Sequence, residues 1–66
     1  MKIKVKFGIW GNYKGYEGAK QVFISKSKFD ATDWLAERLA KDDCELSTKS
    51  DIQTSEINEH IASLAA

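Results

Sequence analysis

Apolar and polar residues alternate strictly from residue 2 to residue 10. One face of this segment carries lysines, Gly8 and Trp10, and the other face is entirely apolar. The apolar residues are Ile3, Val5, Phe7 and Ile9. An unbroken period of two is typical of a β-strand with one buried face. A second apolar segment over residues 19–26 predicts a partner strand, so we expect an antiparallel hairpin that pairs 2–10 with 19–26.

All four glycines of the chain lie within one stretch, GIWGNYKGYEG (8–18). Three aromatic residues, Trp10, Tyr13 and Tyr16, are interleaved with them at every third position. Glycine supplies the positive-φ backbone conformations that chain reversals need. We therefore predict that residues 11–18 form a long hairpin loop that displays the rings. The pattern leaves one alternative open, in which the rings fold back over the sheet and complete a small core.

Two helices are predicted after the hairpin. The first spans about 31–41, with Asp30 as a suitable N-cap. Phe29 and Trp34 have the spacing of a hydrophobic staple around that cap. The second helix spans about 55–64. In both segments the apolar residues recur at intervals of three and four, which predicts one buried face for each helix.

Residues 44–48 also alternate, which leaves a short third strand open. The predicted fold is therefore α+β, with a small antiparallel sheet packed by two helices in the order β-β-α-(β)-α. We expect residues 1–66 to form a single compact domain. A chain of this size buries only a small core, so a homodimer or a tightly bound partner would add stability. The sequence leaves the oligomeric state open.

The net charge of zero conceals a strong asymmetry between the two halves of the chain. Residues 1–28 carry seven lysines and one glutamate, a net charge of +6. Residues 29–66 carry three basic and nine acidic residues, a net charge of −6. Such a split is informative about binding partners rather than about the fold. It does not show which half makes the contact.

The residue types needed for catalysis or for a cofactor are missing. One histidine and one cysteine cannot form a Cys/His zinc site within one chain. The glycine-rich stretch matches no phosphate-binding motif, and no nucleophile and base are paired by spacing. We therefore expect no enzymatic activity, no cofactor and no metal site. No apolar run approaches the roughly 20 residues of a membrane span, and a single cysteine favours the reducing cytoplasm.

The preferred functional hypothesis is a small regulator or inhibitor that occupies a surface of a protein or nucleoprotein complex. Tyrosine and tryptophan dominate the energetics of protein interfaces, and the acidic half could face a basic groove. An inhibitor of a host defence nuclease, of the kind phages deploy, fits the size and the charge layout. The residues expected to contact the partner are Trp10, Tyr13, Lys14, Tyr16, Asp42 and Asp43.

The alternative hypothesis is a nucleic-acid-binding module that uses the basic face of the sheet. Lysines would contact phosphates, and aromatic rings would stack on bases. The residues expected to take part are Lys2, Lys4, Lys6, Trp10, Lys14 and Lys20. The neutral net charge favours the first hypothesis, because binding driven by counterion release needs lysines that no acid compensates.

Overall fold

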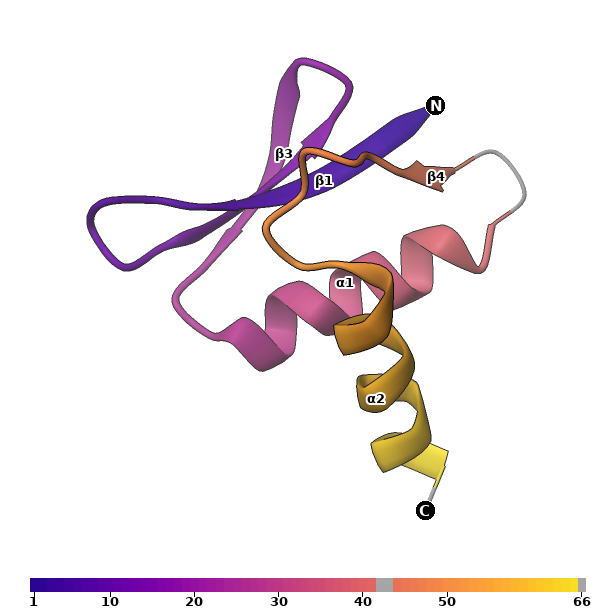
Figure 1. Cartoon of the computed structure of the whole chain (residues 1–66). Helices are drawn as coiled ribbons and strands as arrows, with labels where there is room; N and C mark the ends of the chain where they lie inside the picture. The colour runs from indigo at the N-terminus through magenta and orange to yellow at the C-terminus, as the bar shows by residue number, and fades with distance from the viewer. Residues whose placement is uncertain (42–43, 66) are drawn as a thin grey trace.

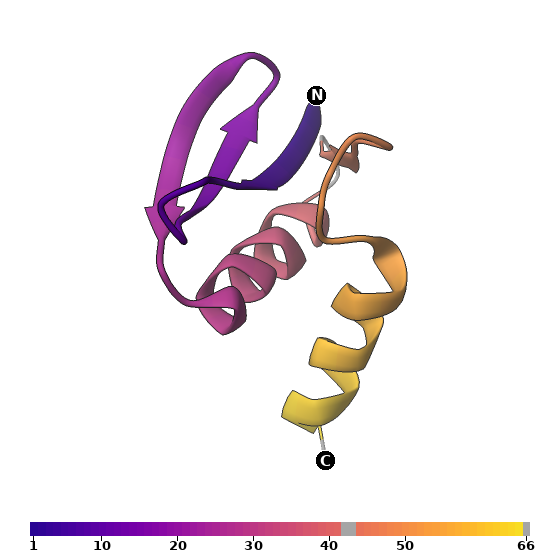
Figure 2. The same ribbon diagram turned by 60° about the vertical axis from the view of Figure 1, so that its left-hand side comes forward.

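The computed structural model describes residues 1–41 and 44–65 and places four strands and two helices in them (Figure 1). The elements are β1 (Lys2–Phe7), β2 (Tyr13–Glu17), β3 (Lys20–Ser25), α1 (Lys28–Leu39), β4 (Glu45–Leu46) and α2 (Thr54–Ala65). Helix α1 lies against one face of the sheet and contacts all four strands, and α2 packs against α1 (Figure 2). The predicted α+β class, a small sheet packed by two helices, is confirmed.

The sheet has the order β3-β2-β1-β4 and is mixed, whereas the sequence predicted an antiparallel sheet. Strands β1, β2 and β3 are antiparallel neighbours, but β4 runs parallel to β1. The predicted pairing of 2–10 with 19–26 is wrong, because β2 lies between these segments. Residues 13–17 show no clear alternation of apolar and polar residues, because the buried central position is Gly15, which has no side chain. The two reversals around β2 are short, and each contains a positive-φ glycine, Gly11 at 79° and Gly18 at 63°.

The free edge of β1 is covered by the chain that follows α1. The predicted short strand over 44–48 is present as the two-residue β4. Beyond it, the backbone N–H groups of Ser47 and Asp51 donate to the carbonyls of Ile3 and Val5, each at 2.8 Å. This pairing satisfies the backbone of β1 on both sides. Strand β3 remains as the other edge of the sheet.

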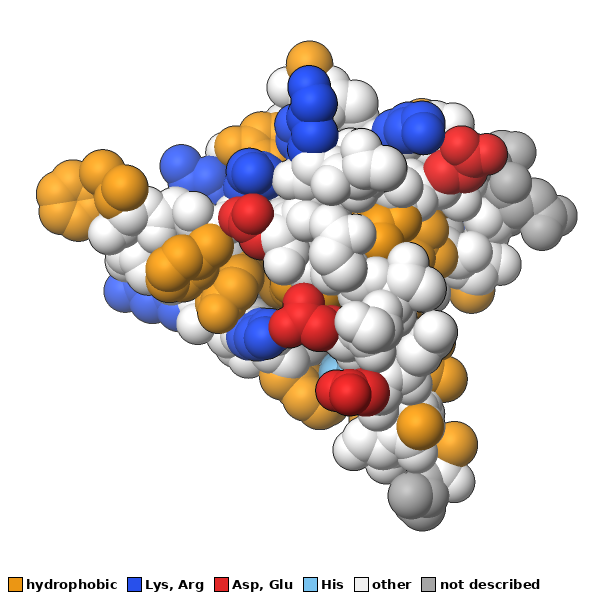
Figure 3. Space-filling view, in the orientation of Figure 1, with side chains coloured by type: hydrophobic (Ala, Val, Ile, Leu, Met, Phe, Trp, Pro, Cys, Tyr) orange, Lys and Arg blue, Asp and Glu red, His pale blue; other side chains and the backbone are white. Residues whose placement is uncertain are grey.

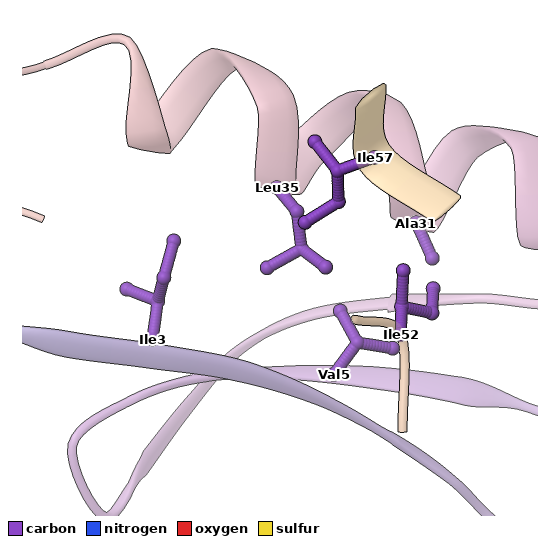
Figure 4. Close-up of a cluster of buried hydrophobic side chains, with 6 residues drawn as sticks. All are labelled: Ile3, Val5, Ala31, Leu35, Ile52 and Ile57. Carbon is purple, nitrogen blue, oxygen red and sulfur yellow. The ribbon is translucent and has the colours of Figure 1, made fainter. Parts of the chain in front are cut away.

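The core contains six buried apolar side chains contributed by β1, both helices and the loop before α2 (Figure 4). They are Ile3, Val5, Ala31, Leu35, Ile52 and Ile57. Ile3 and Val5 lie on the face that the alternation predicted to be buried. Phe7 and Ile9 share that pattern but are 56% and 92% exposed, because β1 ends at Phe7 and the chain turns away from α1. The alternation therefore predicted the buried face correctly for Ile3 and Val5, and wrongly for Phe7 and Ile9 at and beyond the end of β1.

The helices begin and end close to the predicted positions, with one change in capping. Ser27 rather than Asp30 is the N-cap of α1, and its hydroxyl accepts a hydrogen bond from the Asp30 amide at 3.3 Å. Phe29 is thus inside the helix and does not form the predicted staple. Its ring instead lies edge-on to His60 of α2, with centroids 4.6 Å apart. Helix α2 matches the predicted 55–64 within one residue at each end.

Candidate functional site

The turn between β1 and β2, residues 8–12, projects two large apolar side chains into solvent. The Gly8 amide donates to the Asn12 carbonyl at 2.7 Å, and the Gly11 amide donates to the Gly8 carbonyl at 3.1 Å. These bonds close the turn and fix its shape. Ile9 and Trp10 lie between them and are 92% and 80% exposed. Trp10, whose position the sequence left open, is therefore a surface residue.

Two further rings extend this apolar surface along the strands. Phe7 and Tyr13 face each other in the β1–β2 register, and their ring centroids are 4.9 Å apart. Tyr13 is half-buried against the core, and Phe7 is more than half exposed. Phe7, Ile9, Trp10 and Tyr13 together form what we call the apolar tip. Hydrophobic side chains gather at this end of the β1–β2 hairpin, at the left of Figure 3.

The structure does not bring the three predicted rings together as one cluster. Tyr13 and Tyr16 belong to β2 and are three residues apart, so they point to opposite faces of the sheet. Tyr13 lies on the face covered by α1, whereas Tyr16 pairs with Lys4 on the opposite face. Trp10 lies in the turn. Residues 13–17, which the sequence predicted to lie in a long hairpin loop, instead form strand β2, and the turn that carries Trp10 precedes this strand.

The sheet face opposite α1, which we call the open sheet face, is lined by cations and apolar side chains. Lys4, Lys14 and Tyr16 lie at its centre, and Val22 and Ile24 of β3 are 42% and 53% exposed. The Lys4 ammonium lies 5.5 Å from the centroid of the Tyr16 ring. That distance is within the range of a cation–π contact.

The lysines of β1 differ in whether a carboxylate compensates them. Lys2 pairs with Glu45 at 3.9 Å, and Lys6 pairs with Asp51 at 3.3 Å, both along the β4 edge. Within residues 1–41 and 44–65, no carboxylate pairs with Lys4 or with Lys14. The uncompensated charge of the face is therefore at its centre.

The Asp51 carboxylate also anchors the backbone of β1. Its Oδ2 accepts a hydrogen bond from the Phe7 amide at 2.7 Å. This N–H, with a smaller contribution from Lys6, lowers the pKa of Asp51 below its usual value. In the same way, the hydrogen bond from Lys28 lowers the pKa of Glu56 at the α1–α2 interface. Both acids are therefore held in their charged form by the fold.

The acidic half of the sequence lies mainly around the helices. A hollow between β3 and α1 has Phe23 and Trp34 on its walls, and its rim carries three carboxylates. These are Asp30, Asp33 and Glu37. Asp42 and Asp43, which the sequence predicted as partner contacts, lie outside the described residues. The charge split along the chain is therefore only partly kept in space: Lys4 and Lys14 lie on the open sheet face and three carboxylates lie on α1, but Lys2 and Lys6 are paired with acids from the second half of the chain.

The structure places Lys20 away from the open sheet face and His60 at the contact between the two helices. Lys20 pairs with Glu17 in the register, and Glu17 forms an ion pair with Arg38 of α1, so Lys20 alternates away from the open sheet face. The His60 side chain on α2 is only 7% exposed, and its Nε2 lies 3.2 Å from Asp33 Oδ1 on α1. This histidine therefore holds α2 against α1.

Sequence reasoning missed the surface roles of Phe7, Ile9, Val22 and Ile24. The alternation assigned Phe7 and Ile9 to the core. For Val22 and Ile24, the sequence does not indicate which face of β3 is covered by α1. Among the described side chains, no three His, Cys, Asp or Glu residues are grouped so as to hold a metal ion. Neither described helix is long and apolar enough to cross a membrane.

The chain matches no protein-family model, and comparisons with curated proteins and with solved structures likewise find no match.

Proposed function

We propose that the chain is a small non-catalytic binding protein that acts by occupying a surface of a protein or nucleoprotein complex. The observation that carries this proposal is the exposure of Ile9 and Trp10, at 92% and 80%, on a hydrogen-bonded turn. A contiguous exposed apolar patch on a soluble domain commonly marks an interaction site. The apolar tip would be the anchor of the contact.

The energetics favour Trp10 as the central residue of the interface. Burial of a tryptophan at an interface removes on the order of 150 Å² of apolar surface from water, or about 4 kcal/mol before the costs of association. The turn bonds across Gly8 fix the backbone on both sides of the ring, so little backbone order is lost on binding. Phe7 and Tyr13, packed at 4.9 Å, support the base of the tip.

We further propose that the protein is a regulator or an inhibitor that works in the cytoplasm, for example a phage-type inhibitor of a host defence nuclease. The charge distribution supports this class. A nucleoprotein target presents apolar protein surface together with phosphates, and the apolar tip adjoins a basic face with uncompensated Lys4 and Lys14. Three carboxylates of α1, those of Asp30, Asp33 and Glu37, line the hollow between α1 and β3 rather than the surface that carries Lys4 and Lys14.

Site-specific crosslinking tests the proposal. A photoreactive amino acid replaces Trp10 in one sample and Leu64 in a second, because Leu64 is also an exposed apolar residue (57%) but lies on α2. Each protein is irradiated in an extract of its host, and a partner is expected to crosslink from position 10 and not from position 64.

Affinity measurements with the recovered partner then quantify the anchor. Trp10→Ala should weaken binding by about 30-fold or more, the loss typical of an interface hot spot. Leu64→Ala should bind like the wild type. Equal binding by Trp10→Ala and wild type, or crosslinks of the same protein from both positions, would refute the apolar tip as the contact surface.

A further inference from the structure

We propose that the open sheet face binds a single-stranded nucleic acid. This inference goes beyond the role of the apolar tip, because it concerns a different face and a different class of ligand. It rests on the arrangement of side chains across the strands. Lysines occupy β1 and the start of β2, whereas Tyr16 and the exposed Val22 and Ile24 of β3 form an apolar zone beside them, with the polar Gln21 opposite Tyr16.

The two zones match the two chemical ends of a nucleotide. Neighbouring strands lie about 4.8 Å apart, so the lysine side of β1 and the apolar side of β3 are about 10 Å apart. In the register, Lys4 lies opposite Tyr16, and Lys14 lies opposite Ile24. Phosphates can therefore contact the lysines while the bases lie on Tyr16, Val22 and Ile24. Base–aromatic stacking of this kind tolerates any sequence, because every base has a π-face.

The charge pattern of the face favours a polyanion. Lys6 lies directly opposite Lys14 in the antiparallel register, a like-charge pairing that destabilises a sheet. A phosphate placed between them would relieve this repulsion. In the part of the chain that the structure describes, the acids beside this face are Glu45 and Asp51 at its β4 edge, and they pair with Lys2 and Lys6. A strand lying over Lys4 and Lys14 meets no carboxylate.

The shape of the face favours a single strand over a duplex. A duplex keeps its bases stacked inside and would offer only phosphates to the apolar zone, leaving Val22 and Ile24 in contact with charge. Unpaired bases can be spread on an exposed sheet, and aromatic residues on such a sheet then stack with them. The carboxylates of Asp30, Asp33 and Glu37 line a hollow at the β3 edge that Ile24 also borders, so the phosphates would lie over the lysines of β1 and β2 and only the uncharged bases over β3.

Fluorescence anisotropy with labelled 12-nucleotide probes tests the proposal, with oligo(dT), oligo(dA) and oligo(U) as single strands and a 12-base-pair duplex for comparison. If the face neutralises two to four phosphates, log K should fall with log [NaCl] with a slope of about −1.4 to −2.8. At the upper value, affinity falls about 50-fold between 50 and 200 mM salt. Single strands are expected to bind tighter than the duplex.

A charge-matched pair of variants locates the binding face. Lys4→Gln with Lys14→Gln should reduce the salt slope by about 1.4 and abolish most of the binding. Lys28→Gln with Lys41→Gln removes the same charge at α1 and its C-terminal end and should bind like the wild type. Tyr16→Ala should weaken binding by at least about fivefold, the lower end of the loss of one stacked base. Circular dichroism confirms that each variant is folded.

Three results would overturn the inference: no binding by folded wild type at 20 mM salt, equal losses in the two double variants, or tighter binding of the duplex. The outcome is separable from that of the proposed function. Trp10→Ala tests the protein contact and keeps both Lys4 and Lys14, whereas the lysine variants keep the apolar tip. A protein partner captured through Trp10 with no oligonucleotide binding would refute the nucleic-acid face alone.

Discussion

Replacement of Gly15 by alanine should destabilise the protein by a packing clash rather than by backbone strain. Gly15 is buried in β2 and has an ordinary β-strand conformation. A Cβ at this position would lie 2.9 Å from the Phe23 Cβ and 2.9 Å from Trp34 Cζ3. Phe23 and Trp34 are themselves stacked, with centroids 5.3 Å apart and planes at 11°. Because the two rings are stacked, neither ring can move away from the added methyl group without breaking the stacking contact.

The size of the effect follows from two opposing contributions. Insertion of a methyl group into a packed site costs about 1–3 kcal/mol. Alanine also restricts the unfolded chain more than glycine does, which returns about 0.4–1 kcal/mol to the folded state. We therefore expect Gly15→Ala to lower the free energy of unfolding by about 1–2 kcal/mol. In a domain of this size the melting temperature should fall by about 5–15 °C.

Thermal and urea unfolding followed by circular dichroism measure this change. Gly8→Ala is the matched control, since its added Cβ would meet only Asn12 O at 3.4 Å and Lys14 Cε at 3.6 Å, which are ordinary contacts. The control receives the same unfolded-state gain without the clash and should be neutral or slightly stabilised. In a Trp34→Leu background, Gly15→Ala should cost less free energy of unfolding than it costs in the wild type, because the ring that clashes with the added methyl group is absent. A Gly15→Ala protein as stable as Gly8→Ala would refute the close approach of Trp34 to β2.

Three further predictions concern the contacts that hold the loop and α2 in place. Ser50→Ala should cost about 1–3 kcal/mol of unfolding free energy, because the buried hydroxyl accepts from the Val5 amide at 3.1 Å; an unchanged urea midpoint would contradict this. Acid should destabilise the wild type, because folding lowers the pKa of Asp51. The contribution of Asp51 to the free energy of unfolding is present above the pKa of the unfolded chain and is lost as pH falls through the pKa of the folded protein. Asp51→Asn should flatten the decline in urea midpoint between about pH 5 and pH 2, and an unchanged slope would speak against the assignment. His60→Ala removes the contact with Asp33 and should speed amide hydrogen exchange in α2 more than in the sheet; uniform exchange rates would argue that α2 does not detach separately.

The apolar tip shows that sequence alternation predicts a strand but does not predict which of its side chains are buried. The alternation in residues 2–10 predicted a strand with Ile3 and Val5 buried, and both are fully buried. It also assigned Ile9 to the same face, yet this side chain is among the most exposed in the molecule. Period alone cannot show where α1 ceases to cover the sheet. Coverage is a property of the packed elements and not of the strand.

The predicted site residues divide for the same reason. The sequence predicted Lys4 as a nucleic-acid contact, Tyr16 as a partner contact and Lys14 as both, and the structure places all three on the open sheet face. Lys2 and Lys6 have the same spacing along the strand, but they are paired with acids more than 40 residues away in sequence. Which lysines remain uncompensated therefore depends on the path of the chain after α1.

What the sequence determined by itself was local: the strand character of residues 2–7, both helices, the α+β class and the concentration of positive charge in the first 28 residues. These follow from side-chain periodicity and capping, which neighbouring residues fix among themselves. The tertiary structure alone decided that residues 13–17 are a central strand, that β4 runs parallel to β1, and that Tyr13 and Tyr16 face opposite ways. Strand order and the covered face depend on contacts between distant segments, and Gly15 leaves no local trace of the ring that packs on it.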